Sequence, residues 1–218
     1  MLLSHLTRHH TVRYSMAMLK IRNADEEQVH MSEQLARGAF ELFAENGFAN
    51  VNLDQVAARA GVTKGSLYWH YKNKKELILA ACQYYYRQWH EQVQAEITGA
   101  SEPLARLRKV LTFSVNSCLM DSRNRLFTTG VFTLMQEDAE VRAGWSAFYD
   151  SVRGVYMKLV SDVPPAQKQG KAVVRRNVDL MLEAMEGLKL RAGFEPHIAK
   201  PKERQSMVDG LFRILCHE

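Results

Sequence analysis

The stretch between Gln55 and Lys75 carries charges that could bind phosphate groups. It holds five basic residues and no acidic residue, whereas the two signs are mixed in the rest of the chain after residue 24. The five are Arg59, Lys64, Lys72, Lys74 and Lys75. Taken alone, such a run favours a solvated surface, so its meaning depends on the backbone that presents it. If that backbone places the cations on one exposed face, the face is suited to the phosphates of a nucleic acid.

Two short helices joined by a tight turn are predicted in this stretch. Asn52 precedes a helical pattern and Gln55 follows three residues later, which is the arrangement of a capping box. The first helix is expected to end near Ala60, because Gly61 supplies the positive φ that a tight turn demands. Thr63 is then placed to cap a second short helix that extends to about residue 71.

The apolar residues around this turn have the spacing of a helix-turn-helix. Ala57 is small at the point where two helices must cross closely, and the turn glycine follows four residues later. Val62 and Leu67 can close a small core against Val56. Because this spacing coincides with the basic run, the combination favours a phosphate-facing surface and a DNA-binding regulator.

In this region the sequence resembles the tetracycline-repressor (TetR) family of bacterial regulators. The resemblance spans roughly residues 30–80 and is carried by several short motifs in register. They are FELF at 40–43, NGF at 46–48, VA at 56–57, AGVTKGSLY at 60–68, HY at 70–71 and KKEL at 74–77. Asn52 stands where the family usually has threonine, and asparagine caps a helix equally well.

The resemblance implies which residues contact DNA. They are Asn52, Thr63, Lys64, Gly65, Ser66, Tyr68, Trp69, His70 and Lys74. The N-terminal turn of the recognition helix would lie against a phosphate, and Gly65 would let the DNA backbone approach closely. Tyr68 and His70 are suited to hydrogen bonds with phosphate, and Trp69 could pack against a sugar or a thymine methyl. Lys74 would bind a backbone phosphate from the start of the next helix.

The rest of the chain is predicted to be helical, which makes the fold class all-α. Apolar residues recur at alternating steps of four and three over residues 141–159 and again over 174–188. These stripes predict two long helices packed along their length. Pro164 and Pro165 separate them, and Pro201 opens a last short helix. No segment alternates strictly between apolar and polar residues, so no strand is predicted.

Three parts are expected along the chain. They are a basic disordered tail over residues 1–24, a three-helix helix-turn-helix domain over 25–80 and a helical domain over 81–218. The tail has no acidic residue and no sustained apolar period. The resemblance implies that the last part binds an effector and forms a homodimer through its last two long helices. The interface candidates are Met181, Leu182, Met185, Leu188 and Leu211.

An effector pocket in that domain would be lined by aromatic and methionine side chains. Such a lining suits a hydrophobic or planar small molecule, because soft side chains re-pack around varied shapes. The candidates are Phe113, Phe127, Met135, Trp145, Phe148, Tyr149 and Tyr156, with Cys118, Met120 and Phe132 nearby. Core packing explains the same residues at least as well.

Composition and motif content limit the classes of protein to which the chain could belong. The three cysteines are far apart without CxxC spacing, so no disulfide framework, metal site or cofactor is predicted and a reduced cytoplasmic protein is expected. No apolar run is long enough for a membrane span. A helical enzyme has thin support, since neither HExxH nor a glycine-rich phosphate loop occurs. A ligand-free architectural DNA-binding protein stays open, and a filled rather than hollow C-terminal core would favour it.

These expectations combine into one hypothesis. A homodimer would place two recognition helices in successive major grooves of a palindromic double-stranded operator, about one helical turn apart. A small-molecule effector in the C-terminal domain would shift the helix over residues 74–97 and change the spacing of the two DNA-binding units. The resemblance implies repression as the usual direction of regulation.

Overall fold

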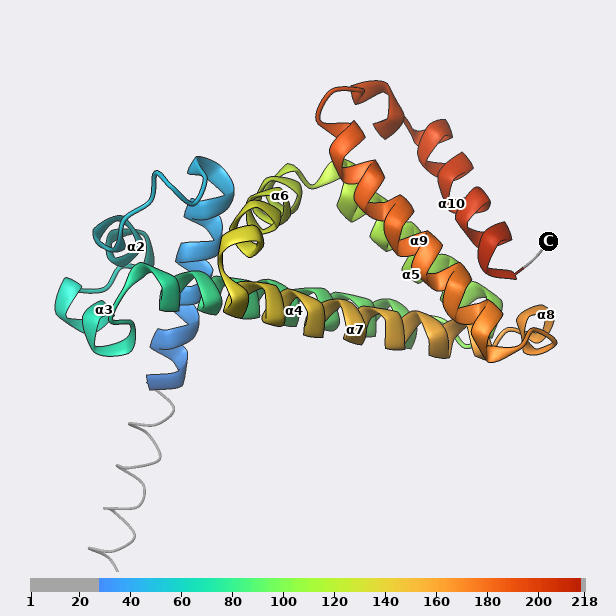
Figure 1. Cartoon of the computed structure of the whole chain (residues 1–218), viewed down its shortest axis with the longest axis horizontal. Helices are drawn as coiled ribbons and strands as arrows, with labels where there is room; N and C mark the ends of the chain where they lie inside the picture. Colours follow the sequence, from blue (N-terminus) through green and yellow to red (C-terminus); the bar gives the residue numbers. More distant parts are fainter. Residues whose placement is uncertain (1–27, 217–218) are drawn as a thin grey trace, which may run out of the picture.

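The computed structural model describes residues 28–216, and every regular element in that range is a helix (Figure 1). The all-α class predicted from the sequence is therefore confirmed. The basic tail expected over residues 1–24 lies outside the described residues. Within the described range, no helix has the length and apolarity to cross a membrane. In the same range, no group of three His, Cys, Asp or Glu side chains is placed to hold a metal ion.

The N-terminal helical unit lies at one end of the molecule (Figure 1). It consists of a first helix, described over residues 28–46, followed by α2 (Leu53–Ala60) and α3 (Lys64–His70). The apolar face of the first helix is buried, as its helical period predicts. The small core of this unit contains Leu35, Ala39, Leu42, Phe43, Val56 and Leu67.

One long helix, α4 (Lys74–Thr98), connects this unit to the rest of the chain. It runs beside α7 (Ala139–Ser161) and packs against α5 (Pro103–Met120) (Figure 1). The domain boundary predicted between residues 80 and 81 falls inside α4. Neither glycine nor proline interrupts the sequence of this helix, so the two parts share one continuous element.

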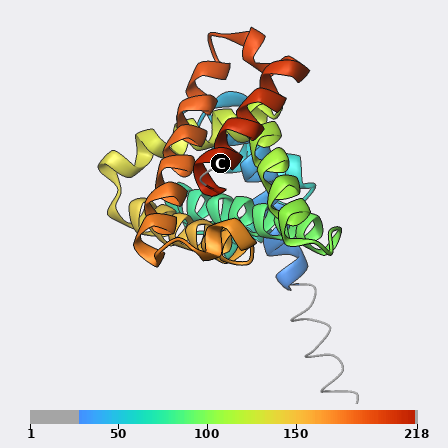
Figure 2. The ribbon, with the colours of Figure 1, turned by 90° about the vertical axis from the view of Figure 1, so that its right-hand side faces the viewer.

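α5 lies at the centre of the C-terminal part. The other elements there are α6 (Ser122–Glu137), α8 (Pro164–Gln167), α9 (Lys171–Ala192), the 3₁₀ turn η1 (Pro196–Ala199) and α10 (Pro201–Cys216). α5 contacts α4, α7, α9 and α10. α9 and α10 form the edge of the molecule away from α2 and α3 (Figures 1 and 2). The predicted helix start at Pro201 is confirmed, and α5 likewise begins at a proline, Pro103.

The expected dimer-interface residues are instead part of the core of the chain. Met181, Leu182, Met185, Leu188 and Leu211 are each at most 8% exposed. The first four form an apolar stripe on α9 that is turned toward α5 and α7, and Leu211 lies on α10, which packs against α5 and α9. A side chain buried inside one chain has little surface left for a partner. This part of the sequence prediction is therefore corrected. An apolar stripe shows which face of a helix is buried, but it does not show whether the same chain or a second chain covers that face.

Two contacts hold the N-terminal unit against α6 and the turn that follows it. The ring of Phe127, on α6, lies with its centroid 4.8 Å from that of Phe40 and 5.3 Å from that of Phe48. Lys75 Nζ, at the start of α4, lies 3.0 Å from Asp138 Oδ2 and 3.0 Å from Glu140 Oε2. The aromatic contact is buried and the ionic one is exposed, so the first contributes more to the junction.

Candidate nucleic-acid interface and ligand cavity

The turn between α2 and α3 has the local structure that its sequence predicts. Asn52 Oδ1 accepts a hydrogen bond from Gln55 N at 2.9 Å, and Asn52 N donates to Gln55 Oε1 at 2.8 Å, which completes the capping box. Gly61 ends α2 in the left-handed conformation with φ of 69°. Val62 N then donates to Ala57 O at 3.0 Å and closes the turn.

α3 begins at a capped residue and is anchored by one buried side chain. Thr63 Oγ1 accepts from Ser66 N at 3.1 Å, and Leu67 is buried in the core. Ser66 Oγ donates to Met31 Sδ at 2.6 Å. The side chain of Ser66 therefore points toward the first helix, so its expected contact with DNA, which rests on the backbone N–H groups of this turn, stays a prediction.

Two large rings are left exposed on the outer face of α3. Tyr68 is 51% exposed and Trp69 is 65% exposed. His70 is half-buried beside Trp69, with the ring centroids 4.8 Å apart, and its burial lowers the pKa of the imidazole. His70 is thus a neutral hydrogen-bonding group at pH 7. Two adjacent exposed rings form a contiguous apolar patch, and such patches mark interaction sites more often than single exposed rings do.

Three of the five cations in the basic run are paired with carboxylates of the chain. Lys64 Nζ lies 2.5 Å from Asp54 Oδ2. Arg59 pairs with Glu45 at 2.7 Å, and Lys75 makes the ion pairs with Asp138 and Glu140 given above. The basic run of the sequence is therefore partly neutralised in the folded chain by carboxylates that lie outside it. Exposed pairs of this kind are weak because water screens the two charges, so a phosphate can displace the carboxylate from Lys64.

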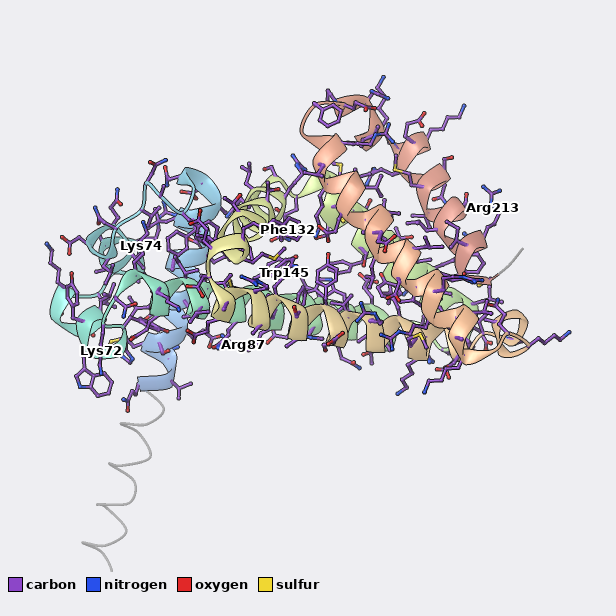
Figure 3. The ribbon with its side chains drawn as sticks, in the orientation of Figure 1. Lys72, Lys74, Arg87, Phe132, Trp145 and Arg213 are labelled. Carbon is purple, nitrogen blue, oxygen red and sulfur yellow. The ribbon has the colours of Figure 1, made fainter. Side chains whose placement is uncertain are left out.

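Lys72 and Lys74 are the two cations of the basic run that have no carboxylate partner among the described residues (Figure 3). Neither has a carboxylate within 4.0 Å among the described residues, and Lys74 Nζ donates to Ala49 O at 3.2 Å. Gly65 is exposed between Lys64 and Ser66. A Cβ at Gly65 would meet nothing closer than Thr63 Oγ1 at 3.8 Å among those residues. The fold itself therefore does not require glycine at position 65.

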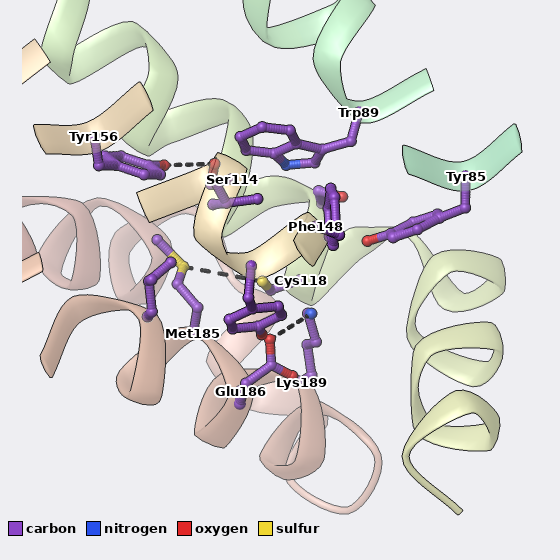
Figure 4. A pocket seen from close by; sticks show the side chains of 13 residues that line it. Tyr85, Trp89, Ser114, Cys118, Phe148, Tyr156, Met185, Glu186 and Lys189 are labelled. Carbon is purple, nitrogen blue, oxygen red and sulfur yellow. Dashed lines mark hydrogen bonds and ion pairs between the residues drawn. The ribbon is translucent and has the colours of Figure 1, made fainter. Parts of the chain in front are cut away.

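A cavity of about 50 Å³ lies between α4, α5, α7 and α9 (Figure 4). Phe148, Tyr149 and Tyr156 line it, as expected, together with Cys118. Sequence reasoning assigned none of the other lining residues to a pocket. They are Tyr85, Trp89, Ser114, Ser117, Val152, Leu182, Met185, Glu186 and Lys189. Leu182 and Met185 thus line the cavity rather than a dimer interface.

The other four pocket candidates lie elsewhere. Phe127 is buried at the junction with the first helix, and Trp145 stacks on Tyr85 with the centroids 6.3 Å apart. Met135 packs against the core. Phe113 lines a separate surface groove beside α6. None of these four residues lines the cavity, because aromatic character alone does not distinguish a core position from a cavity wall.

The cavity contains polar groups that the aromatic pattern does not reveal. Tyr156 Oη donates to Ser114 Oγ at 2.7 Å, and Lys189 Nζ donates to Glu186 Oε1 at 2.7 Å (Figure 4). Glu186 and Lys189 are three residues apart on α9. Exposed ion pairs on helices have the same spacing, so the sequence alone does not show that this pair is buried. For Tyr85 and Trp89, the sequence offered only a weak sign of burial, which was their place in the apolar period of α4.

Known proteins resemble the chain in both sequence and fold. Residues 35–81 match the family model described as bacterial regulatory proteins, tetR family. The HTH-type transcriptional regulator TtgR of Pseudomonas putida is 27% identical over 179 residues, which cover 77% of this chain and 82% of TtgR. A transcriptional regulator from Rhodococcus sp. Rha1 has a similar solved structure, with a TM-score of 0.70 at 19% identity over 85% of this chain and 96% of that one. A TetR-family regulator from Streptomyces coelicolor gives a TM-score of 0.67 at 21% identity over 84% and 94%.

The capped turn, the exposed face of α3 and these comparisons define a DNA-binding protein of the helix-turn-helix class. Over residues 35–81 it carries the DNA-binding unit of the TetR family of transcriptional regulators, and over most of its length it is similar to regulators of that kind. Its relatives regulate transcription and are not enzymes, so the helical-enzyme alternative is set aside.

Proposed function

We propose that the chain is a homodimeric repressor that binds a palindromic operator and is released by a small-molecule effector. The observation that carries this proposal is the path of α4. The helix begins at Lys74 beside α3, and further along it places Tyr85 and Trp89 in the cavity wall. One continuous element therefore touches both the DNA-binding unit and the space where an effector would bind.

The proposed DNA contacts come from the exposed residues of the helix-turn-helix. α3 would enter the major groove, with Tyr68 and Trp69 against the bases and sugars of the site. The remaining contacts are proposed for Asn52, Thr63, Lys64, Gly65, His70 and Lys74. Lys64 would exchange Asp54 for a phosphate on binding.

The proposed homodimer uses the outer faces of α9 and α10. Leu180 is 48% exposed and Ile214 is 40% exposed. Between and beside them lie small residues, including Ala184, Gly187 and Gly210, which allow helices of two chains to approach closely. A two-fold interface of this kind would present the two DNA-binding units to a palindromic site.

The proposed effector would act through the side chains of α4. Tyr85 also packs at 6.2 Å from Phe40 of the first helix and at 5.6 Å from Phe127. A ligand that moves Tyr85 would therefore displace groups that hold the N-terminal unit in place. The ligand shifts the equilibrium only by its difference in affinity for the DNA-bound and released conformations.

A ligand-free architectural protein is the second candidate, and the size of the cavity favours it. Pockets for drug-sized ligands hold about 300–1,000 Å³, whereas this cavity holds about 50 Å³. The buried Glu186–Lys189 pair favours the effector-binding regulator. Desolvating two charges is costly, and apolar side chains would fill a purely structural core without that cost. We place the protein in the cytoplasm, where its DNA would be.

The decisive experiment measures DNA binding and mass together. Footprinting on the DNA upstream of its own gene should show protection of two half-sites related by two-fold symmetry, and light scattering should give a dimer. Trp69→Ala should abolish the footprint. Phe194→Ala removes another exposed ring at the far end of α9 and should leave the footprint unchanged. A monomer that protects no such site would refute the proposal.

A further inference from the structure

The charged residues among those lining the cavity are one glutamate and one lysine. Glu186 and Lys189 both come from α9, and their side chains are only 21% and 13% exposed. Burial raises the pKa of Tyr85 to about 12 and that of Cys118 to about 11, so both stay uncharged at neutral pH. The cavity is therefore lined by a balanced pair of opposite charges.

The carboxylate of this pair is only half satisfied. Its Oε1 accepts from Lys189, while its Oε2 is buried and has no hydrogen-bond partner among the described residues. A buried acceptor left without a donor is costly, and an anionic one more so. Lys189 carries three N–H donors, of which this contact uses one. The pair can thus receive one donor at Glu186 and offer one at Lys189.

We propose that the cavity binds a small, neutral aromatic molecule that donates a hydrogen bond to Glu186 Oε2 and accepts one from Lys189. A phenol with a carbonyl group is the simplest example. This assignment rests on the proposed effector site and adds its chemistry. The donor of the ligand would fill the one open position of the carboxylate and form a charge-assisted hydrogen bond.

Neutrality follows from the charge balance of the site. An organic cation or an organic anion would bring a third charge into a site where the existing two already cancel, and that charge would be buried without a counter-ion. A neutral donor meets no such cost. The same argument excludes a purely apolar ligand, because it would leave Glu186 Oε2 unsatisfied.

Aromatic character follows from the walls. Trp89 and Phe148 lie edge to face with centroids 5.6 Å apart, and Tyr149 lies beside Phe148 at 6.1 Å. A planar ring can stack among such groups. At about 50 Å³ the cavity must widen to admit even one ring. The thioether of Met185, whose sulfur lies 3.9 Å from that of Cys118, is the most adaptable part of the wall.

Calorimetry of the full-length protein with four probes tests the assignment. The probes are 4-hydroxyacetophenone, 4-methoxyacetophenone, benzoate and benzyltrimethylammonium. Wild type should bind the hydroxy compound at least tenfold more tightly than the methoxy compound, which lacks the donor. It should bind both ions more weakly than the hydroxy compound. Equal binding of hydroxy and methoxy probes, tighter binding of either ion, or no binding of the hydroxy probe would overturn the proposal.

Two variants change the charge of the site in opposite directions. Glu186→Gln leaves Lys189 uncompensated and should shift the preference toward benzoate. Lys189→Met leaves Glu186 uncompensated and should shift it toward benzyltrimethylammonium. Glu195→Gln breaks an exposed ion pair with Arg191 on the following turn and should change no preference. Preferences that stay constant across all variants would overturn the proposal, even if one variant folds poorly.

The outcome is separable from the proposed function. Binding to the operator is measured without any probe, so a protein that binds its operator and ignores the hydroxy probe disproves only the ligand class. A protein that binds the hydroxy probe but protects no operator disproves the repressor and leaves the cavity assignment intact.

Discussion

Phe48 packs its ring directly over Gly130. A Cβ atom at position 130 would lie 2.6 Å from both Cδ2 and Cε2 of Phe48. Phe48 follows the first helix of the DNA-binding unit, and Gly130 lies in the middle of α6. The absence of a side chain at residue 130 is therefore what allows α6 to approach the unit.

Gly130→Ala is expected to weaken this junction. The methyl group must displace a buried ring, and overpacking of this kind costs about 1–3 kcal/mol. Thermal unfolding followed by circular dichroism measures the loss. Gly154→Ala on α7 is the matched control, because a Cβ there meets no described atom within 4 Å and alanine favours a helix by about 1 kcal/mol. If both variants are stabilised, the packing of Phe48 on Gly130 is not tight.

Gly65→Ala is expected to separate stability from DNA binding. The chain has room for the methyl group, so the free energy of unfolding should rise by up to about 1 kcal/mol. Operator affinity should fall at least tenfold, because the methyl group stands where the DNA backbone approaches. Fluorescence anisotropy with labelled operator measures the affinity. An alanine variant that binds as tightly as wild type would show that DNA does not come close to residue 65.

Asp54→Asn is expected to strengthen DNA binding. It frees Lys64 from its carboxylate partner and removes a negative charge from the interface. Lys64→Gln should do the reverse and reduce the slope of log affinity against log salt by about 0.9. Asp209→Asn on α10, which breaks the ion pair with Arg108 of α5, is the control at the other end of the molecule. An unchanged salt slope in Lys64→Gln would mean that Lys64 contacts no phosphate.

Leu180→Arg and Met181→Ala are expected to give opposite results, although the residues are adjacent. Leu180 is exposed, so arginine there should dissociate the dimer while each chain stays folded. Met181 is fully buried, so alanine should destabilise the chain by about 2–5 kcal/mol. Light scattering and chemical denaturation measure the two effects. A Leu180→Arg protein that remains dimeric would move the interface away from this face of α9.

Asp138 is expected to make the stability of the protein depend on acid pH. The neighbouring Lys75 holds the pKa of this carboxyl below its ordinary value, and backbone N–H groups at the start of α7 add to the effect. A depressed pKa contributes stability above the ordinary value, and the contribution disappears as pH falls through the folded-state pKa. Asp138→Asn should therefore flatten the decline of stability below about pH 4. Denaturation midpoints across that window would test this, and parallel curves for the two proteins would contradict it.

Local sequence rules predicted the helix-turn-helix because its determinants are local. The capping box at Asn52, the glycine turn at position 61 and the cap at Thr63 each involve residues within a few positions of one another. The start of α6 was not predicted, because few local signals in the sequence mark it. Only Asp121, which accepts from Asn124 N at 3.0 Å, marks the break from α5, and no glycine or proline accompanies it.

The candidate cavity depended on tertiary packing and was only partly predictable. Phe148 and Tyr156 belong to the stripe that defines α7, and this stripe gives the buried face without distinguishing a filled core from a hollow one. Glu186 and Lys189 were missed because their spacing is that of an ordinary surface pair. Only the contact of α9 with α5 and α7 shows that both are enclosed.

Because α4 is one uninterrupted helix, a tilt at the cavity also moves its other end, beside α3. Its 25 residues extend about 37 Å. Tyr85 lies eleven residues after Lys74, or about 16 Å along the axis. If α4 tilted by about 5° about Tyr85, its start at Lys74 would move by about 1.4 Å, given the rise per residue of an α-helix. In the proposed dimer, a side-chain displacement too small to change the core would therefore become a mismatch with the spacing of two DNA grooves.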